Sequence, residues 1–327
     1  MIKCGIIGAG AWGSAISTLI GCDKILIWSR NKTVVKSINK KRLNPYLKGI
    51  KLPKNLFATN SIKDLQECDY FFIATPTQFT RKILTKLKKY KIKKNFIICS
   101  KGIENKSCKF LSNIIKEVFP NSKIAIMSGP SFAIEVANKL PTAVLVASKE
   151  KNFFNNISKL INKKYFRLYF SNDIIGCQLG GAIKNIYAIG AGMLQGLKLG
   201  ENAKSAFVSR SFAEILRFSK KFGAKEKTFF GLSGLGDLIL TCNSSKSRNT
   251  NFGKLITNNK KSINKIIKKN KTITEGYYSI KPIYEISKKN KIDMPILKSI
   301  YKILYKNSNM KKEIELILGR SIKKEFY

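Results

Sequence analysis

Residues 2–30, IKCGIIGAGAWGSAISTLIGCDKILIWSR, divide into an apolar strand, a glycine turn, a helix and a second strand. Ile2–Ile7 is a short apolar run typical of a buried strand, and GAGAWG follows it directly. A helical stretch occupies Ser14–Ile20, and Lys24–Trp28 is again apolar. We therefore expect a βαβ unit that opens a dinucleotide-binding domain.

The glycine turn, residues 8–13, has the spacing GxGxxG. Gly8 permits a tight turn, Gly10 lets a pyrophosphate approach the backbone, and Gly13 lets the helix pack on the strand. The phosphates would lie over the helix N-terminus, where free N–H groups and the helix dipole favour negative charge. The spacing alone is common, but between a strand and a helix it indicates a nucleotide site rather than a chance glycine-rich turn.

The residues that follow the second strand bear on the choice of cofactor. A site selective for NAD usually has an acidic residue here to bind the ribose 2′-hydroxyl. This chain has Ser29 and Arg30 instead, a pair better suited to a 2′-phosphate. We therefore expect NADPH, with NADH possible, and the alternative is that Arg30 is merely exposed.

Four more apolar runs are expected to be strands: Tyr70–Ala74, Phe96–Cys99, Ile124–Met127 and Thr142–Ala147. Three of these runs end in turn-like segments: TPTQ (75–78), SKGIE (100–104) and SGPSF (128–132). In an open parallel sheet, ligands bind beyond the carboxyl ends of the strands. We therefore expect Lys101, Gly129 and Ser131 to line a ligand cleft.

After Asn172 the apolar positions recur with helical spacing, in residues 173–197, 201–222, 277–290 and 294–306. Residues 258–271, rich in Lys and Asn, are expected to form a surface helix with solvated lysines. The predicted fold is an α/β Rossmann-type dinucleotide-binding domain (1–172), followed by an all-α domain (173–327) for substrate binding and catalysis. A cleft is expected between the two.

Lys184 is the only charged side chain between Asp173 and Lys198, in QLGGAIKNIYAIGAG (178–192). A lysine in water has a pKa of ~10.4 and is a poor base at neutral pH. Desolvation, or a second cation such as Lys101, would lower that pKa and suit the amine for proton transfer. The alternative is a side chain that reaches the helix surface with its stem on apolar neighbours.

A second polar group occurs in FGLSGLGDLILTCNSSKSRN (230–249), where Asp237 stands among glycines and apolar residues. Ten residues later Ser247, Arg248 and Asn249 offer a hydroxyl, a guanidinium and an amide. Arginine binds phosphate oxygens in pairs, which lysine cannot do. The alternatives are a capping or turn aspartate at 237 and an exposed loop arginine at 248.

The chain carries 62 Lys and Arg residues against 19 Asp and Glu, a formal net charge of +43. Such a field attracts nucleic acid, anionic lipid or phosphorylated metabolites. The excess is almost all Lys, comes with abundant Ile and Asn, and is spread over the whole chain. We attribute it to compositional bias and solvated surface, with polyanion binding as the alternative.

No histidine is present, which excludes proton transfer by histidine and His-ligated metal sites. The seven cysteines are scattered without a CxxC pair, which favours reduced thiols in a cytosol over disulfides or a zinc site. No segment reaches ~20 unbroken apolar residues. We therefore expect a cytoplasmic protein with no metal, no membrane insertion and no specific nucleic-acid partner.

Taken together, the motifs resemble those of the bacterial-type NAD(P)-dependent glycerol-3-phosphate dehydrogenases over almost the whole chain. The segments that carry the resemblance, in the order and spacing of that family, are GAGAWG, SKGIE, SGPSF, QLGGAIKNIYAIGAG, GLGDLILTC, SRN and TEGY. The first is common to many dinucleotide enzymes, whereas the set is highly specific. Ala11 stands where a serine is frequent, and its backbone N–H still suits a phosphate.

The resemblance implies reversible hydride transfer between NAD(P)H and dihydroxyacetone phosphate, giving sn-glycerol 3-phosphate for phospholipid synthesis. It implies Lys184 as the proton acceptor in oxidation and donor in reduction, with Asn185 and Thr241 ordering the amine and the carbonyl. The implied substrate contacts are Lys101, Gly129, Ser131, Lys184, Asp237, Ser247, Arg248 and Asn249. The implied cofactor contacts are Gly8, Gly10, Ala11, Trp12, Gly13, Arg30, Lys101, Ala133, Arg248 and Glu275. A homodimer is also implied.

Two other functions stay open at this point. One is a related two-domain reductase acting on another small anionic keto or hydroxy compound, against which Asp237 and the SRN segment argue. The other is a basic protein that binds nucleic acid, which would need a contiguous basic face with interleaved aromatic side chains.

Overall fold

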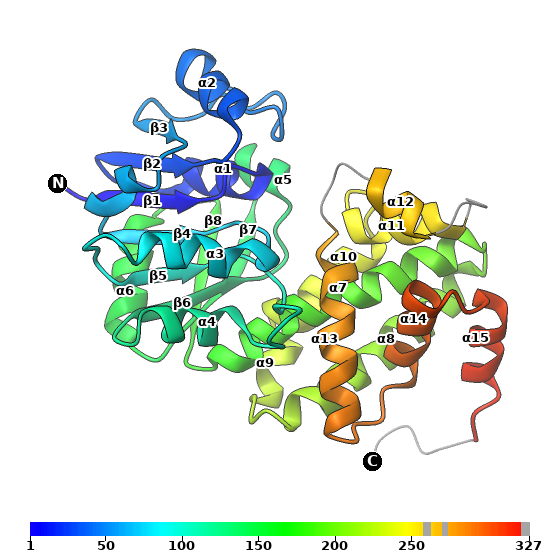
Figure 1. Ribbon diagram of the computed structural model, residues 1–327. Helices are drawn as coiled ribbons and strands as arrows, with labels where there is room; N and C mark the ends of the chain where they lie inside the picture. The colour runs from blue at the N-terminus through cyan, green and yellow to red at the C-terminus, as the bar shows by residue number, and fades with distance from the viewer. Residues whose placement is uncertain (258–262, 270–273, 322–327) are drawn as a thin grey trace.

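A computed structural model describes residues 1–257, 263–269 and 274–321 of the chain. A sheet flanked by helices forms the N-terminal part, and a group of helices around one long central helix forms the rest (Figure 1). The predicted fold class is therefore confirmed. The helix expected at 258–271 is seen as α12 (Ile263–Lys269), and the other residues of that range lie outside the described part.

Eight strands form one sheet in the order β3-β2-β1-β4-β5-β6-β7-β8. Their bounds are β1 Lys3–Ile7, β2 Lys24–Trp28, β3 Leu56–Thr59, β4 Tyr70–Ile73, β5 Asn95–Ile98, β6 Lys123–Ser128, β7 Thr142–Ser148 and β8 Phe166–Ser171. The six expected strands are all present, with ends within one residue of the expected ones. The two edge strands, β3 and β8, were not expected.

The sheet is mixed rather than wholly parallel, because β7 runs antiparallel to β6 while every other neighbouring pair is parallel. The segment between β6 and β7 contains only the short helix α5 (Ala133–Ala137), which does not carry the chain across the sheet. Strand β7 therefore begins at the edge where β6 ends. The carboxyl ends of β1, β4, β5 and β6 still share that edge, as expected.

The glycine turn lies at the topological switch point, where the order of strands reverses between β1 and β4. Gly8 has a φ of +120°, and a Cβ there would lie 2.8 Å from the backbone of Ala74. A Cβ on Gly13 would lie 1.9 Å from the Gly8 carbonyl oxygen. Both glycines are thus required by the packing of β1, β4 and α1 (Ala11–Leu19).

Helices cover both faces of the sheet. One core packs α1 and α6 (Lys151–Leu160) against the sheet, and the other packs α3 (Thr77–Leu87) and α4 (Leu111–Val118) against its opposite face. Helix α2 (Lys32–Lys41) follows β2, and a short 3₁₀ helix, η1 (Lys63–Glu67), precedes β4.

The C-terminal part is built around α7 (Ile174–Gly196), in which the side chain of every residue from 176 to 193 is buried. Asp173 caps this helix, its Oδ1 accepting the N–H of Gly176 at 2.8 Å. The other elements are α8 Gly200–Lys220, α9 Glu226–Phe230, the π-helical turn η2 Leu232–Gly236, α10 Asp237–Asn243, α11 Arg248–Thr257, α13 Glu275–Lys289, α14 Pro295–Lys306 and α15 Met310–Leu318. The four helices expected from spacing correspond to α7, α8, α13 and α14. No helix in the described ranges is long and apolar enough to cross a membrane.

Two glycines bring α11 against α7. A Cβ on Gly192 would lie 2.0 Å from the Thr250 carbonyl oxygen, and one on Gly253 would lie 2.1 Å from the Ile189 carbonyl oxygen. The two backbones therefore approach more closely than any other residue type would allow. This contact fixes the start of α11, and with it residues 247–249, beside the central helix.

We expect Gly253→Ala to lower the free energy of unfolding by about 1–3 kcal/mol, because the added methyl group would force α11 away from α7. Gly21→Ala is the matched control, since a Cβ at Gly21 would find its nearest neighbour at an ordinary 3.7 Å. Denaturant-induced unfolding measures both. Equal stability of the two variants would contradict the close packing of α7 and α11.

Candidate active site

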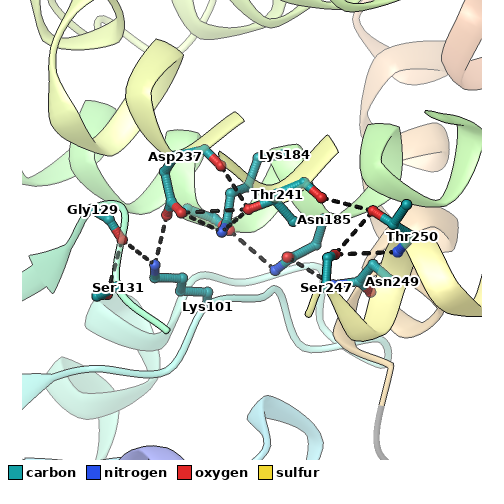
Figure 2. Close-up of polar contacts among 11 residues, drawn as sticks. Lys101, Gly129, Ser131, Lys184, Asn185, Asp237, Thr241, Ser247, Asn249 and Thr250 are labelled. Carbon is teal, nitrogen blue, oxygen red and sulfur yellow. Dashed lines mark hydrogen bonds and ion pairs between the residues drawn. The ribbon is translucent and has the colours of Figure 1, made fainter. Parts of the chain in front are cut away.

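Three charged side chains from distant parts of the sequence meet beyond the carboxyl edge of the sheet (Figure 2). Lys184 projects from the middle of α7, Asp237 is the first residue of α10, and Lys101 follows β5. The Lys184 ammonium donates to Asp237 Oδ1 at 2.5 Å, and the Lys101 ammonium donates to Asp237 Oδ2 at 2.6 Å. One carboxylate therefore pairs with an amine from each of the two parts of the chain.

Lys184 does not reach the surface with its amine, since the residue is only 6% exposed. Burial, assisted by the positive charge of Lys101, lowers the pKa of Lys184 to about 8, while the Asp237 carboxylate opposes this shift. An amine with this pKa can exchange a proton near neutral pH, which an ordinary solvated lysine cannot do efficiently. The geometry thus favours the acid–base interpretation of Lys184 over the surface-lysine alternative.

Asp237 is 1% exposed, and its side chain does not cap the helix that it begins. Thr241, one turn later in α10, accepts a hydrogen bond from the Lys184 ammonium at 2.7 Å and donates to the Asp237 carbonyl at 2.6 Å. The capping alternative for Asp237 is therefore wrong. Helix α10 instead presents a carboxylate and a hydroxyl to the same amine.

Asn185 lies beside the amine but bonds elsewhere. Its Oδ1 accepts from Asn249 Nδ2 at 2.9 Å, and Asn249 Oδ1 accepts the backbone N–H of Gly276 at 3.1 Å. These bonds join α7, α11 and α13 behind the site. No hydrogen bond links the Asn185 side chain to Lys184 within the described residues, in contrast to Thr241.

The turn after β6 supplies backbone and hydroxyl groups to the same place. The Gly129 carbonyl accepts from the Lys101 ammonium at 3.0 Å and from Ser131 Oγ at 3.0 Å. A Cβ on Gly129, whose φ is +157°, would lie 2.9 Å from the Val144 Cα. The turn therefore holds the Lys101 amine toward Asp237, with Ser131 alongside (Figure 2).

The three residues of the SRN segment differ in exposure. The buried Ser247 hydroxyl accepts the N–H of Thr250 at 3.2 Å and lies 3.0 Å from Thr250 Oγ1, so it orders the first turn of α11. Asn249 is also buried, and its side chain forms the hydrogen bonds with Asn185 and Gly276 described above. Arg248 is exposed and forms no hydrogen bond or ion pair with another described residue. Its guanidinium is thus available to a ligand. Arg248 begins helix α11 and does not lie in a loop, as the alternative interpretation assumed.

The residues around the glycine turn fit a dinucleotide. A Cβ on Gly10 would find no protein atom within 4 Å, so internal packing does not require this glycine. Helix α1 has no side-chain cap at its N-terminus, where Ala11 and Trp12 offer backbone N–H groups. The buried Trp12 Nε1 has no hydrogen-bond partner within the described residues. A bound pyrophosphate would use the backbone N–H groups of Ala11 and Trp12 directly.

The remaining predicted cofactor residues lie at the ends of three other elements. Arg30 follows β2, is exposed, and has its guanidinium carbon 5.1 Å from the centre of the Phe79 ring. Ala133 begins α5, which packs on α1. Glu275 begins α13, and its Oε1 accepts the N–H of Thr77 at the start of α3, at 3.2 Å. Burial raises the pKa of Glu275 to about 7, opposed by the Thr77 N–H and by the Arg248 charge.

Two residues, Thr77 and Asn44, contact Glu275 and the glycine turn, respectively, and were not predicted from the sequence as part of the site. Thr77 lies in the quoted TPTQ turn, but nothing in the sequence indicates that Glu275 binds its N–H. Asn44 contacts the glycine turn from a loop that carries no motif. Within the described residues there is no group of three or more His, Cys, Asp or Glu side chains that could hold a metal ion.

The chain is similar to known proteins in both sequence and fold. A family model described as the NAD-dependent glycerol-3-phosphate dehydrogenase N-terminus matches residues 3–154, and that of the C-terminus matches residues 173–315. A protein of Clostridium botulinum named glycerol-3-phosphate dehydrogenase [NAD(P)+] is 39% identical, with both chains covered completely. One of Zymomonas mobilis with the same name is 38% identical over 98% of this chain and 94% of its own length. The crystal structure of glycerol-3-phosphate dehydrogenase from Coxiella burnetii superposes with a TM-score of 0.92 at 30% identity, covering 98% of this chain and 99% of that one.

We expect Gly10→Ala to weaken NADPH binding by about tenfold or more, because its methyl group would occupy the space that the pyrophosphate needs. Stability should not fall, since no protein atom lies within reach of that methyl group. Gly13→Ala is the contrasting variant and should lose stability itself. Fluorescence titration with NADPH and thermal unfolding separate the two effects; undiminished NADPH affinity in Gly10→Ala would rule out this turn as the phosphate site.

Proposed function

The chain belongs to the NAD-dependent glycerol-3-phosphate dehydrogenase family, and we propose that it reduces dihydroxyacetone phosphate to sn-glycerol 3-phosphate in a reversible reaction. As a member of that family it is an NAD(P)-dependent oxidoreductase. We further propose that the product supplies glycerophospholipid synthesis in the cytoplasm. The observation that carries the catalytic assignment is the buried Lys184 amine, held by Asp237 and Thr241.

The cofactor would lie between the two parts of the chain, with residues 1–172 as the dinucleotide-binding domain and 173–327 as the catalytic domain. The glycine turn would bind the pyrophosphate through the N–H groups of Ala11 and Trp12. Arg30 would bind a 2′-phosphate, which favours NADPH over NADH. The other residues proposed to contact the cofactor are Lys101, Ala133, Arg248 and Glu275. When bound, the nicotinamide supplies or accepts the hydride.

Lys184 would supply the proton of the reaction. As hydride reaches the carbonyl carbon, negative charge develops on the carbonyl oxygen, and a positioned ammonium stabilises that charge and then protonates the oxygen. Asp237 and Thr241, one turn apart on α10, both accept hydrogen bonds from the amine, so that it is in place before the reaction begins. In the reverse direction the neutral amine would take the proton from the hydroxyl group.

The substrate phosphate would be bound away from the reacting carbon by Arg248, whose planar guanidinium suits two phosphate oxygens. Lys101, Gly129 and Ser131 would contact the three-carbon chain from the nucleotide-binding domain, while Asp237, Ser247 and Asn249 would do so from the helical domain. A homodimer, as expected from the resemblance, completes the proposal. The net charge of +43 would also attract this anionic substrate.

The proposed activity is tested by following oxidation of NADPH, or of NADH, with dihydroxyacetone phosphate and with unphosphorylated dihydroxyacetone. We expect fast turnover only with the phosphorylated ketone, because Arg248 has no anion to bind in the other. Faster turnover with NADPH than with NADH would support the assignment of Arg30. Folded protein that binds NADPH but turns over neither ketone would point instead to a reductase with another anionic substrate.

The pKa of Lys184 sets the expected pH dependence. Ketone reduction needs the ammonium form, so its kcat should fall as pH rises through about 8, whereas kcat for alcohol oxidation should rise through the same pH. Lys184→Met should lower both by at least about a hundredfold and leave the Kd for NADPH within about twofold. Lys220→Met, an exposed lysine on α8, is the control. Substantial turnover by Lys184→Met would exclude this residue as the proton donor.

Arg248→Lys should raise the KM for dihydroxyacetone phosphate by about tenfold or more and change kcat much less, because an ammonium cannot bind two phosphate oxygens in parallel. Arg167→Lys, on the edge strand β8, removes the same fork away from the cleft and should leave KM unchanged. Steady-state kinetics at saturating NADPH compare the two. A KM that stays at the value of the unmodified enzyme would refute the phosphate contact.

A further inference from the structure

The side chain of Asn44, a buried residue in the loop after α2, forms hydrogen bonds with the glycine turn and with the start of α1. Asn44 is 2% exposed, and its Nδ2 donates to the Ala9 carbonyl at 3.1 Å and to Ser14 Oγ at 2.6 Å. Its Oδ1 accepts the N–H of Tyr46 at 2.9 Å. The two Nδ2 contacts lie on either side of Gly10, one at Ala9 within the turn and one at Ser14 in the first turn of α1. Both hydrogens of this amide are thus used to hold the turn.

The bond to Ala9 fixes the direction of the next N–H group. The Ala9–Gly10 peptide is trans, and in a planar trans peptide the C=O and N–H groups point in opposite directions. Because Asn44 binds the Ala9 carbonyl, the Gly10 N–H is directed away from Asn44. That N–H donates no hydrogen bond to another described residue.

A glycine does not hold this direction by itself. Gly10 has no Cβ, so steric contacts restrict rotation of its flanking peptides less than at any other residue type. Rotation of the Ala9–Gly10 peptide would turn the Ala9 carbonyl oxygen toward the place proposed for the pyrophosphate, and two negative groups would then face one another. The same absence of a side chain that admits the phosphate therefore leaves the turn in need of an external support.

We propose that Asn44 is a positioning residue for the cofactor, which holds the Ala9 carbonyl so that the Gly10 N–H faces the dinucleotide phosphates. The inference rests on the proposed cofactor site and adds to it a residue that touches neither cofactor nor substrate. It predicts an effect on dinucleotide affinity that is larger than the effect on turnover at saturating cofactor. It also predicts that loss of stability and loss of affinity can be separated by comparison with another asparagine of the same domain.

Asn39 is that control. Its side chain exchanges two hydrogen bonds with the backbone of Ala58, at 2.9 and 2.8 Å, and makes no contact with the glycine turn. We expect Asn44→Ala to raise the Kd for NADPH by about tenfold or more, which corresponds to about 1.4 kcal/mol. The kcat at saturating NADPH should stay within about threefold, and the KM for dihydroxyacetone phosphate within about twofold. Asn39→Ala should lower the thermal midpoint yet leave the Kd for NADPH within about twofold.

A second variant guards against poor folding of Asn44→Ala. Asn44→Asp keeps the size of the side chain and the acceptor for the Tyr46 N–H, but it places a carboxylate oxygen against the Ala9 carbonyl. This repulsion should turn the peptide, and the Kd for NADPH should rise at least as much as in Asn44→Ala. Equal Kd values in the Asn44 and Asn39 variants, or an unchanged Kd in Asn44→Asp, would overturn the inference.

Failure of this inference can be told apart from failure of the cofactor site itself. If Gly10→Ala weakens NADPH binding and the Asn44 variants do not, the phosphates bind the glycine turn but Asn44 does not orient it. If none of these variants changes the Kd for NADPH, the glycine turn is not the phosphate site and the proposal for Asn44 fails with it.

Discussion

The site depends on one carboxylate shared by two amines. Asp237 is buried with Lys184 on one oxygen and Lys101 on the other, and the two lysines belong to different parts of the chain. Removing the carboxylate would leave a buried ammonium without a counterion, which is costly in a desolvated place. In the proposed reaction, the Asp237 carboxylate would keep Lys184 charged for a developing oxyanion, while burial and Lys101 lower its pKa to about 8, near the pH at which it would release its proton.

Small residues make that arrangement possible, because Lys101 and η2 both pack against the same short segment of α7. A Cβ on Gly181 would lie 2.7 Å from Ser128 Oγ and 3.3 Å from the Lys101 side chain, and one on Gly180 would lie 2.3 Å from the Ser233 carbonyl oxygen. One turn before Lys184, α7 therefore has glycines at the positions where the nucleotide-binding domain and η2 pack against it. The glycines of this segment serve close packing around the amine and not flexibility.

The two parts of the chain divide the chemistry between them. The sheet edge offers uncapped backbone N–H groups at the start of α1, which suit phosphates, and a glycine at position 10, where no side chain stands in the way of a cofactor. The helical part offers charged side chains on rigid helices, which suit proton transfer and anion binding. Direct hydrogen bonds between the two parts, from Lys101 to Asp237 and from the Thr77 N–H to Glu275, hold the two sets of groups in place relative to one another. A substitution that moves the groups of one part should therefore also move those of the other.

The sequence by itself determined the fold class, the six inner strands, the four most regular helices and the residue types of the site, because apolar periodicity and glycine spacing act over short stretches of chain. It could not determine the edge strands β3 and β8, since their apolar residues are partly exposed and do not form the buried run typical of an inner strand, nor the reversed direction of β7, which depends on how residues 129–141 fold. The helix around Lys184, taken alone, left two interpretations of this lysine about even, and the later motifs favoured the acid–base one. Only the tertiary structure shows that the amine is buried rather than at the surface, because Asp237 and Lys101 approach it from segments 53 and 83 residues away in the sequence, and a pKa is set by neighbours in space. The support of the glycine turn by Asn44, 35 residues away from Ala9, is of the same kind.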